Sequence, residues 1–101
     1  MTVLADGSVD SLVALGGEID MDNAPQVRQF LTGMLERDRP GRLLIDMQDV
    51  TFLGSAGVHA LVYCQTDADR LGSRVELRRP RPQVREVLQI CGVTEMFNLP
   101  G

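Results

Sequence analysis

The chain has 101 residues, of which 44% are hydrophobic, and it carries a formal net charge of −4 with a pI near 4.8. This size and apolar content suit one domain over residues 1–101, and the acidic balance argues against a nucleic-acid surface, which normally needs a basic face. Because the sequence contains neither an apolar run of about 20 residues nor the basic start and apolar core of a signal peptide, we expect a cytoplasmic protein.

The first predicted element is a β-hairpin. Two short apolar runs, Thr2–Ala5 and Val9–Leu15, are separated by the turn-forming residues Asp6, Gly7 and Ser8. The segment 16–20, which begins with two glycines, is expected to close the hairpin.

A helix is predicted over residues 24–38. Asn23 is a favoured capping residue, Pro25 is tolerated in the first turn, and Gln26 stands where a capping box needs it. Apolar residues that recur at spacings of three and four predict one buried face: Ala24, Val27, Phe30, Leu31, Met34 and Leu35. The pair Pro40-Gly41 then ends the helix.

The central strand is predicted over Arg42–Met47, because this run is nearly continuously apolar. A loop through Gln48 and Asp49 follows, and a second helix is expected over Val58–Leu71. Its apolar face repeats at spacings of four and three, through Gly57, Leu61, Cys64, Ala68 and Leu71.

The last third of the chain predicts one strand and one helix. Val75–Leu77 is a short strand, Pro82–Ile90 is a helix, and Gly92 ends that helix. The final segment, Val93–Pro100, fits either a strand or a turn. This order of elements predicts an α/β protein with a mixed sheet and helices packed against it.

Ser55 lies between the predicted central strand and the second helix, with Gly54 and Gly57 close by. The first turn of a helix has unpaired N–H groups and the positive end of the helix dipole, so it favours an anion. A phosphoryl group on Ser55 would bring about two negative charges to that position. Ser55 is therefore either a regulated serine or only a helix N-cap, a role that contributes about 1 kcal/mol.

Four segments of the chain resemble the STAS domain family and, within it, the bacterial anti-sigma factor antagonists. These segments are Gly17-Glu18-Ile19-Asp20, Leu44-Ile45-Asp46-Met47, the loop Phe52-Leu53-Gly54-Ser55-Ala56-Gly57-Val58, and Leu88-Gln89-Ile90-Cys91-Gly92-Val93. The resemblance covers nearly the whole chain. It implies a STAS-like mixed β-sheet of about four strands with three or four α-helices packed against it.

The resemblance also implies a function in transcription regulation and stress response. An unphosphorylated antagonist binds an anti-sigma factor that is also an ATP-dependent serine kinase, and a sigma factor is released. Phosphorylation of the antagonist then breaks the complex. By this resemblance Ser55 is the phosphoacceptor, Asp20 and Asp46 are acidic residues near it, and Gly57 opens the helix. The residues expected to bind the partner are Asp20, Asp22, Gly54, Ser55, Ala56, Gly57, Val58 and His59, with Asp46 in support.

The loop departs from the family pattern at two positions. Gly54 stands where the family usually has Asp, and Ala56 stands where it has a second hydroxyl-bearing residue. Two alternatives therefore remain beside the phosphorylated switch. The first is an unphosphorylated, constitutive antagonist. The second is a STAS-type module that binds a nucleotide or another small ligand beside the Ser55 turn.

The sequence gives little support to catalysis, cofactor binding or metal binding. A nucleophile elbow needs Gly two residues before the serine, where this chain has Leu53, and His59 lies one turn further along the same helix. We therefore expect no enzyme activity and no cofactor. Six aspartates are expected to be turn or cap residues rather than metal ligands: Asp6, Asp10, Asp20, Asp22, Asp46 and Asp49.

Two further features keep a structural and a functional interpretation. Cys64 and Cys91 are expected to be buried packing residues, unless the fold brings them together as a redox-sensitive pair. A basic cluster is either a solvated rim or a docking edge for an acidic partner; it consists of Arg78, Arg79, Arg81 and Arg85. The protein is expected to be a monomer or a weak dimer.

Overall fold

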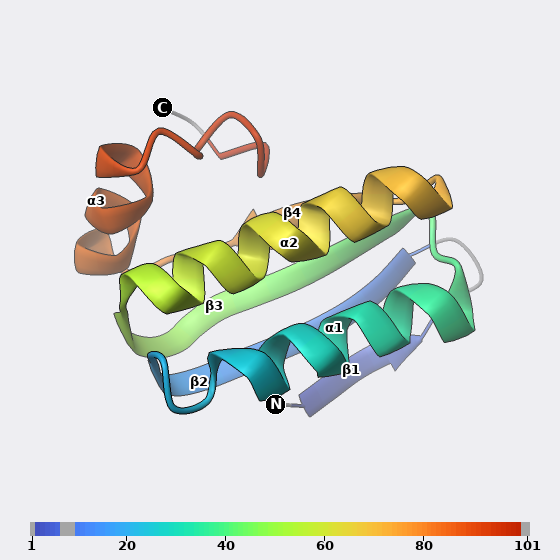
Figure 1. Cartoon of the computed structure of the whole chain (residues 1–101), viewed down its shortest axis with the longest axis horizontal. Helices are drawn as coiled ribbons and strands as arrows, with labels where there is room; N and C mark the ends of the chain where they lie inside the picture. Colours follow the sequence, from blue (N-terminus) through green and yellow to red (C-terminus); the bar gives the residue numbers. More distant parts are fainter. Residues whose placement is uncertain (1, 7–9, 100–101) are drawn as a thin grey trace.

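One sheet with the strand order β1-β2-β3-β4 forms the framework of the protein (Figure 1). The structure is a computed structural model that describes residues 2–6 and 10–99. Its strands are β1 (Thr2–Asp6), β2 (Asp10–Ile19), β3 (Arg42–Leu53) and β4 (Arg74–Arg78). Its helices are α1 (Ala24–Asp38), α2 (Ser55–Leu71) and α3 (Pro82–Ile90). β2, β3 and β4 run parallel, and β1 pairs antiparallel with β2, which confirms the predicted mixed α/β class.

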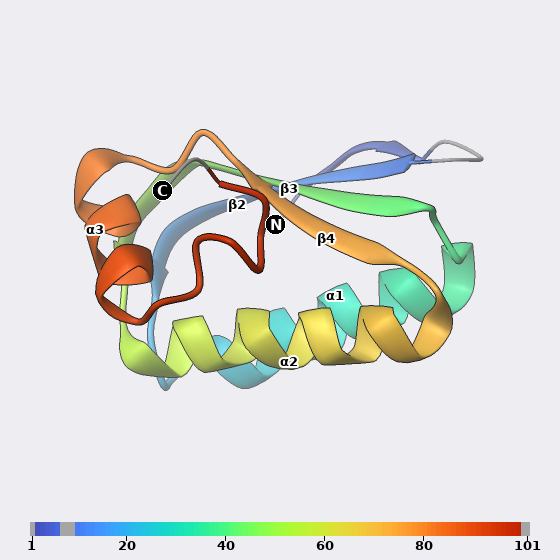
Figure 2. The same cartoon turned by 90° about the horizontal axis from the view of Figure 1, so that it is seen from above.

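α1 and α2 lie side by side over one face of the sheet, and α3 lies toward the end where β3 leads into α2 (Figure 2). The core fills the space between the sheet and this helical layer. Alternate side chains of the parallel strands point into it, among them Val13, Leu15, Leu43, Ile45, Met47, Val75 and Leu77, and the helices contribute Leu31, Met34, Leu35 and Leu61. Burying one such side chain contributes about 1.5 to 3 kcal/mol.

The predicted helix over residues 24–38 is confirmed with its buried face, and Pro25 lies in its first turn. Asn23 is the N-cap residue of α1, as predicted, but the predicted capping box is wrong. Asn23 makes no side-chain hydrogen bond to the helix; its Oδ1 accepts the Asp20 N–H at 3.0 Å, and its Nδ2 donates to the Glu18 carbonyl at 2.7 Å. Asn23 therefore fixes the turn that precedes α1. The predicted helix over residues 82–90 is also confirmed, as α3.

The two central strands are longer than predicted. β2 continues through both glycines to Ile19, because Gly17 adopts a φ of 73° beside a register shift and the pairing with β3 resumes beyond it. β3 continues through Gln48 and Asp49, which were predicted to form a loop, as far as Leu53. The antiparallel β1–β2 pair confirms the predicted hairpin, but residues 7–9 of its turn lie outside the described residues.

The segment after α3 forms turns rather than a strand over its described residues, 93–99. It passes beside β4, where the Leu77 N–H donates to the Phe97 carbonyl at 3.3 Å. The Phe97 side chain is fully buried in the core. This part of the chain therefore adds to the core, although the sequence left its structure open.

The two cysteines differ in their surroundings. Cys64 is fully buried, and burial raises the pKa of its thiol to about 12, so the reactive thiolate is strongly disfavoured. Cys91 follows the last turn of α3 and is exposed. The prediction of a buried packing residue is confirmed for Cys64 and wrong for Cys91, because the turn after α3 faces solvent.

Asp46 links β3 to the connection between β4 and α3, and this link makes a pH-dependent contribution to stability. Its carboxylate accepts the Gln48 N–H at 3.0 Å and forms an ion pair with Arg79, a residue at a left-handed φ of 55°. Burial alone raises the pKa of Asp46, but these two hydrogen bonds outweigh it and hold the pKa below the ordinary value of 3.8.

We expect Asp46→Asn to lower the free energy of unfolding by about 1 kcal/mol at pH 7. Because the folded-state pKa of Asp46 is depressed, its stabilisation is present above pH 3.8 and is lost as the pH falls through the folded-state value. The gap between wild type and variant should therefore close on acidification, which urea denaturation at a series of pH values measures. Asp22→Asn is the control, and a gap that is constant with pH would contradict this role of Asp46.

Candidate functional site

Two turns meet at the end of the sheet where the parallel strands β2 and β3 finish. The Gly54 N–H donates to the Ile19 carbonyl at 2.9 Å, so the start of α2 is held against the end of β2. The turn into α1 begins at Asp20, and the turn into α2 contains Ser55. Loops that follow the carboxyl ends of parallel strands are common positions for binding residues in α/β proteins. We call this region the Ser55 corner, which comprises residues 20–23, Phe52 and residues 54–56.

Ser55 is the first residue of α2 rather than its cap. The N-cap is Gly54, whose carbonyl accepts the Val58 N–H at 3.0 Å. Ser55 is exposed, and its hydroxyl has no hydrogen-bond partner among the described residues. The interpretation of Ser55 as a helix cap is therefore wrong, and the hydroxyl lies free at the positive end of the α2 dipole.

Gly57 is buried against the ends of both strands. A Cβ atom at this position would lie 2.6 Å from Leu53 Cδ1, 2.9 Å from Ile19 Cγ2 and 3.0 Å from the Ile19 carbonyl oxygen. Val58 is also buried, with 3% of its surface exposed. Gly57 and Val58 were both predicted to contact a partner, but their burial means that they position the Ser55 corner from inside.

The acidic side of the corner is a fixed turn. The Asp20 carboxylate accepts the Asp22 N–H at 3.0 Å, and the Asp20 carbonyl accepts the Ala24 N–H at 2.8 Å. Asp22 is exposed, while Asp20 is half-buried. The structure therefore brings these two predicted residues to the same corner as Ser55.

Two exposed apolar side chains belong to this corner and were missed as candidates in the sequence. Met21 is 77% exposed and Phe52 is 50% exposed. Phe52 lies close to the Ser55 turn, because its Cε2 is 3.3 Å from the position of a Cβ atom on Gly54. The only signal for Phe52 was its place beside the buried Leu53, since neighbouring strand residues face opposite sides.

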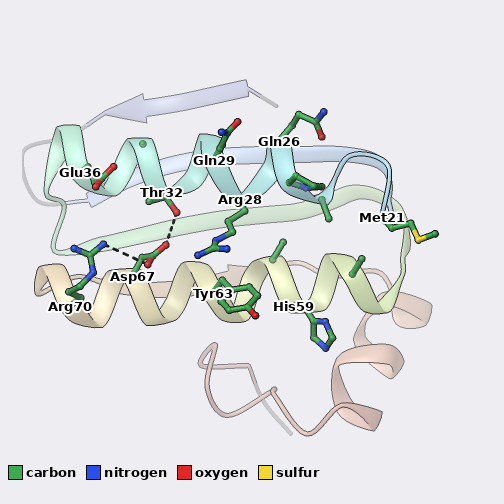
Figure 3. Close-up of a pocket in the computed structure, with 15 residues that line it drawn as sticks. Met21, Gln26, Arg28, Gln29, Thr32, Glu36, His59, Tyr63, Asp67 and Arg70 are labelled. Atoms are coloured by element: carbon green, nitrogen blue, oxygen red, sulfur yellow. Dashed lines mark hydrogen bonds and ion pairs between the residues drawn. The ribbon is translucent and has the colours of Figure 1, made fainter.

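A groove of about 820 Å³ runs from the corner between α1 and α2 (Figure 3). Met21 and Ala56 line its end at the corner, and Arg28 and Tyr63 lie further along, with the guanidinium 4.3 Å from the ring centroid. His59, which was predicted to contact the partner, lines the groove but points away from α1 (Figure 3). No hydrogen bond joins His59 to Ser55 in the described part of the chain.

Other predicted residues lie outside the corner. Asp46 pairs in the sheet with Ala14 and Arg78, whereas the corner begins after the Ile19–Leu53 pair, so Asp46 does not support Ser55 directly. The basic cluster is largely engaged by its own chain. Besides the Arg79–Asp46 ion pair, Arg78 lies 3.3 Å from Glu76, and Arg81 donates to the Gln48 carbonyl at 2.8 Å.

Within residues 2–6 and 10–99, no group of three or more His, Cys, Asp or Glu side chains is arranged to hold a metal ion. No helix in these ranges is long and apolar enough to cross a membrane. What the described chain offers at the corner is an exposed hydroxyl beside exposed apolar and acidic side chains.

Comparisons with known proteins identify relatives for almost the whole chain. Residues 3–100 match the STAS domain family. The anti-sigma-F factor antagonist RsfB of Mycobacterium tuberculosis is 32% identical over 98 residues, which cover 95% of this chain and 77% of RsfB. A solved anti-sigma factor antagonist from Mycobacterium paratuberculosis has 33% identity and a TM-score of 0.78, with 97% of this chain and 83% of that chain covered.

A solved structure of the anti-sigma factor antagonist SpoIIAA in its unphosphorylated form has a TM-score of 0.81 at 20% identity. The likeness covers 94% of this chain and 83% of that chain. At this identity it shows the shared fold alone. The shared fold therefore agrees with the match of the sequence to the STAS domain family.

Proposed function

This chain belongs to the STAS domain family and, within it, to the anti-sigma factor antagonists, and we propose that it binds an anti-sigma factor through the Ser55 corner. The proposed partner is also an ATP-dependent serine kinase that phosphorylates Ser55. Binding of the unphosphorylated protein releases a sigma factor, and phosphorylation ends the binding.

The observation that carries this proposal is the exposed Ser55 hydroxyl at the start of α2, which has no hydrogen-bond partner among the described residues. Met21 and Phe52, which belong to the same corner, are exposed as well. Exposed apolar side chains beside a polar target are typical of a protein interface, where they supply the buried centre. The same surface therefore suits both the binding and the modification that ends it.

The switch follows from the charge that modification adds. In the transfer, Ser55 Oγ forms a bond to the γ-phosphorus of ATP. The bond between that phosphorus and the bridging oxygen of ADP breaks, ADP leaves, and the hydroxyl proton is released. The product carries about two negative charges, which must lose water when the interface closes. A partner that is complementary to the acidic turn already pairs its cations with Asp20 and Asp22, so a phosphate on Ser55 loses water without gaining a new ion pair.

The absence of a carboxylate at Gly54 bears on how the modified form is held. The phosphate lies at the N-terminus of α2, where unpaired backbone N–H groups and the helix dipole favour an anion. A carboxylate at residue 54 would repel it. Gly54 should therefore make phosphorylated Ser55 easier to hold than the usual acidic residue does.

Native mass spectrometry tests the proposal. The protein and its Ser55→Ala variant are mixed with each anti-sigma kinase of the source genome, with and without ATP. We expect a complex in the absence of ATP, and its loss as one phosphoryl mass appears on the wild type only. A complex that never gains mass would leave a constitutive antagonist and remove the switch, and no complex with any of the kinases would overturn the proposal.

A further inference from the structure

One cation in the groove between α1 and α2 lies over an aromatic ring. The Arg28 guanidinium lies over the Tyr63 ring, 4.3 Å from its centroid, and makes no ion pair among the described residues. Arg70, at the far end of the groove, is different. It lies 3.7 Å from Asp67, which also accepts the Thr32 hydroxyl at 2.8 Å (Figure 3).

This groove continues the Ser55 corner without a break. Met21 and Ala56 belong to the corner and also line the groove, while Arg28 and Tyr63 lie between them and the Asp67 end (Figure 3). Tyr63 is 51% exposed, so half of a large amphipathic side chain is available to a partner. A protein that covers Ser55 can therefore extend over Arg28 and Tyr63 in the same contact.

We propose, building on the function proposed above, that the anti-sigma factor places a segment with an acidic side chain between apolar ones in this groove. Its carboxylate pairs with the Arg28 guanidinium, and its apolar side chains pack on Tyr63 and Met21. The groove thus selects the partner by a contact that phosphorylation of Ser55 does not itself alter.

Charge complementarity leads to this choice of partner. A protein that covers Arg28 removes water from its guanidinium, and a buried charge without a partner is strongly unfavourable. A carboxylate restores the pairing, in a two-bond geometry that suits a guanidinium. Tyr and Arg are also enriched among the residues that dominate interface energies. A basic or wholly apolar segment would leave the Arg28 charge uncompensated.

Isothermal titration calorimetry with the anti-sigma kinase that binds in native mass spectrometry tests this contact. We expect Arg28→Glu to raise the Kd about 30-fold or more, because it removes one partner of a charge pair and adds repulsion. Tyr63→Ala should raise the Kd about tenfold. Arg28→Lys keeps the charge but loses the planar fork, so its Kd should lie between those of wild type and Arg28→Glu.

The matched control is Arg37→Glu, the same charge change on the same helix at an exposed residue outside the groove. Its Kd should stay within about twofold of wild type. Thermal unfolding checks that all variants fold. If Arg28→Glu binds like wild type and phosphorylation still releases the partner, the groove contact is wrong and the proposed function stands. If wild type binds no anti-sigma factor, the proposed function fails first.

Discussion

Gly57→Ala is expected to lower the free energy of unfolding by about 2 kcal/mol, a typical result of overpacking a tight contact. The added Cβ would approach the Leu53 and Ile19 side chains to within 3.0 Å, and it would lie 3.0 Å from the Ile19 carbonyl oxygen. That oxygen is not free to move, because it accepts the Gly54 N–H. The start of α2 must therefore shift outward, and the Ser55 corner shifts with it.

Gly33→Ala makes the same substitution in α1 and should have the opposite effect. A Cβ atom at Gly33 meets nothing within 4 Å, and its backbone is helical, so alanine should stabilise the protein by about 0.5 to 1 kcal/mol. Urea denaturation gives both values from the transition midpoints. Equal stability of Gly57→Ala and wild type would show that α2 is not seated tightly on the strand ends.

Gly57→Ala should also weaken the proposed complex with the anti-sigma factor, because the change moves the corner through which we propose that it binds. Thr66→Ala changes an exposed residue of the same helix outside the groove, so its Kd should stay within about twofold of wild type. If Gly57→Ala bound the anti-sigma factor as tightly as wild type, the tight packing of this glycine would not matter for recognition.

The sequence predicts the helices well because their local signals agree. α1 has an apolar face of period 3.6, a proline in its first turn and a Pro-Gly pair after its end, and the structure matches these bounds. α3 starts at Pro82 and ends before the left-handed Gly92, as predicted. In both helices the information lies within a few residues of each boundary.

The strand ends could not be read in the same way, because a neighbouring strand decides them. Gly16 and Gly17 are typical of a strand end, yet β2 passes through them with two register shifts, because β3 offers pairing partners as far as Leu53. Gln48 and Asp49 are polar and suit a loop, but they lie on an exposed part of β3. Pairing between residues that are 32 to 34 positions apart, such as Asp10 with Arg42 and Ile19 with Leu53, has no local signature.

Only part of the candidate site could be read from the sequence, because its other residues also depend on contacts between distant segments. The position of Ser55 beside Asp20 and Asp22 follows from the order of elements in a parallel sheet. Met21 and Phe52 carry no such signal, since an isolated apolar residue is usually buried and only the fold shows that these two are exposed. The contact between Arg28 and Tyr63 also depends on how two helices pack side by side.

Ser55→Asp is expected to raise the Kd for the anti-sigma factor about 100-fold, because a carboxylate covered by the partner loses water without gaining a cation. The same change should stabilise the unbound protein slightly, by about 0.3 to 1 kcal/mol, since a negative charge at the first position of α2 interacts favourably with the helix dipole. Weaker binding together with a higher free energy of unfolding would show that recognition is lost while the fold is intact.

Thr66→Asp is the matched control for this experiment. Thr66 is exposed on the same helix, its hydroxyl donates to the Val62 carbonyl at 3.2 Å, and it lies outside the groove that leads from the corner. It receives the same charge, so a general effect of net charge on association should appear equally in both variants, whereas the proposed interface predicts a large change for Ser55→Asp alone. Calorimetry at two salt concentrations separates these cases, because a long-range charge effect fades with added salt and the desolvation of a covered carboxylate does not. Parallel weakening of both variants that salt abolishes would place Ser55 outside the contact.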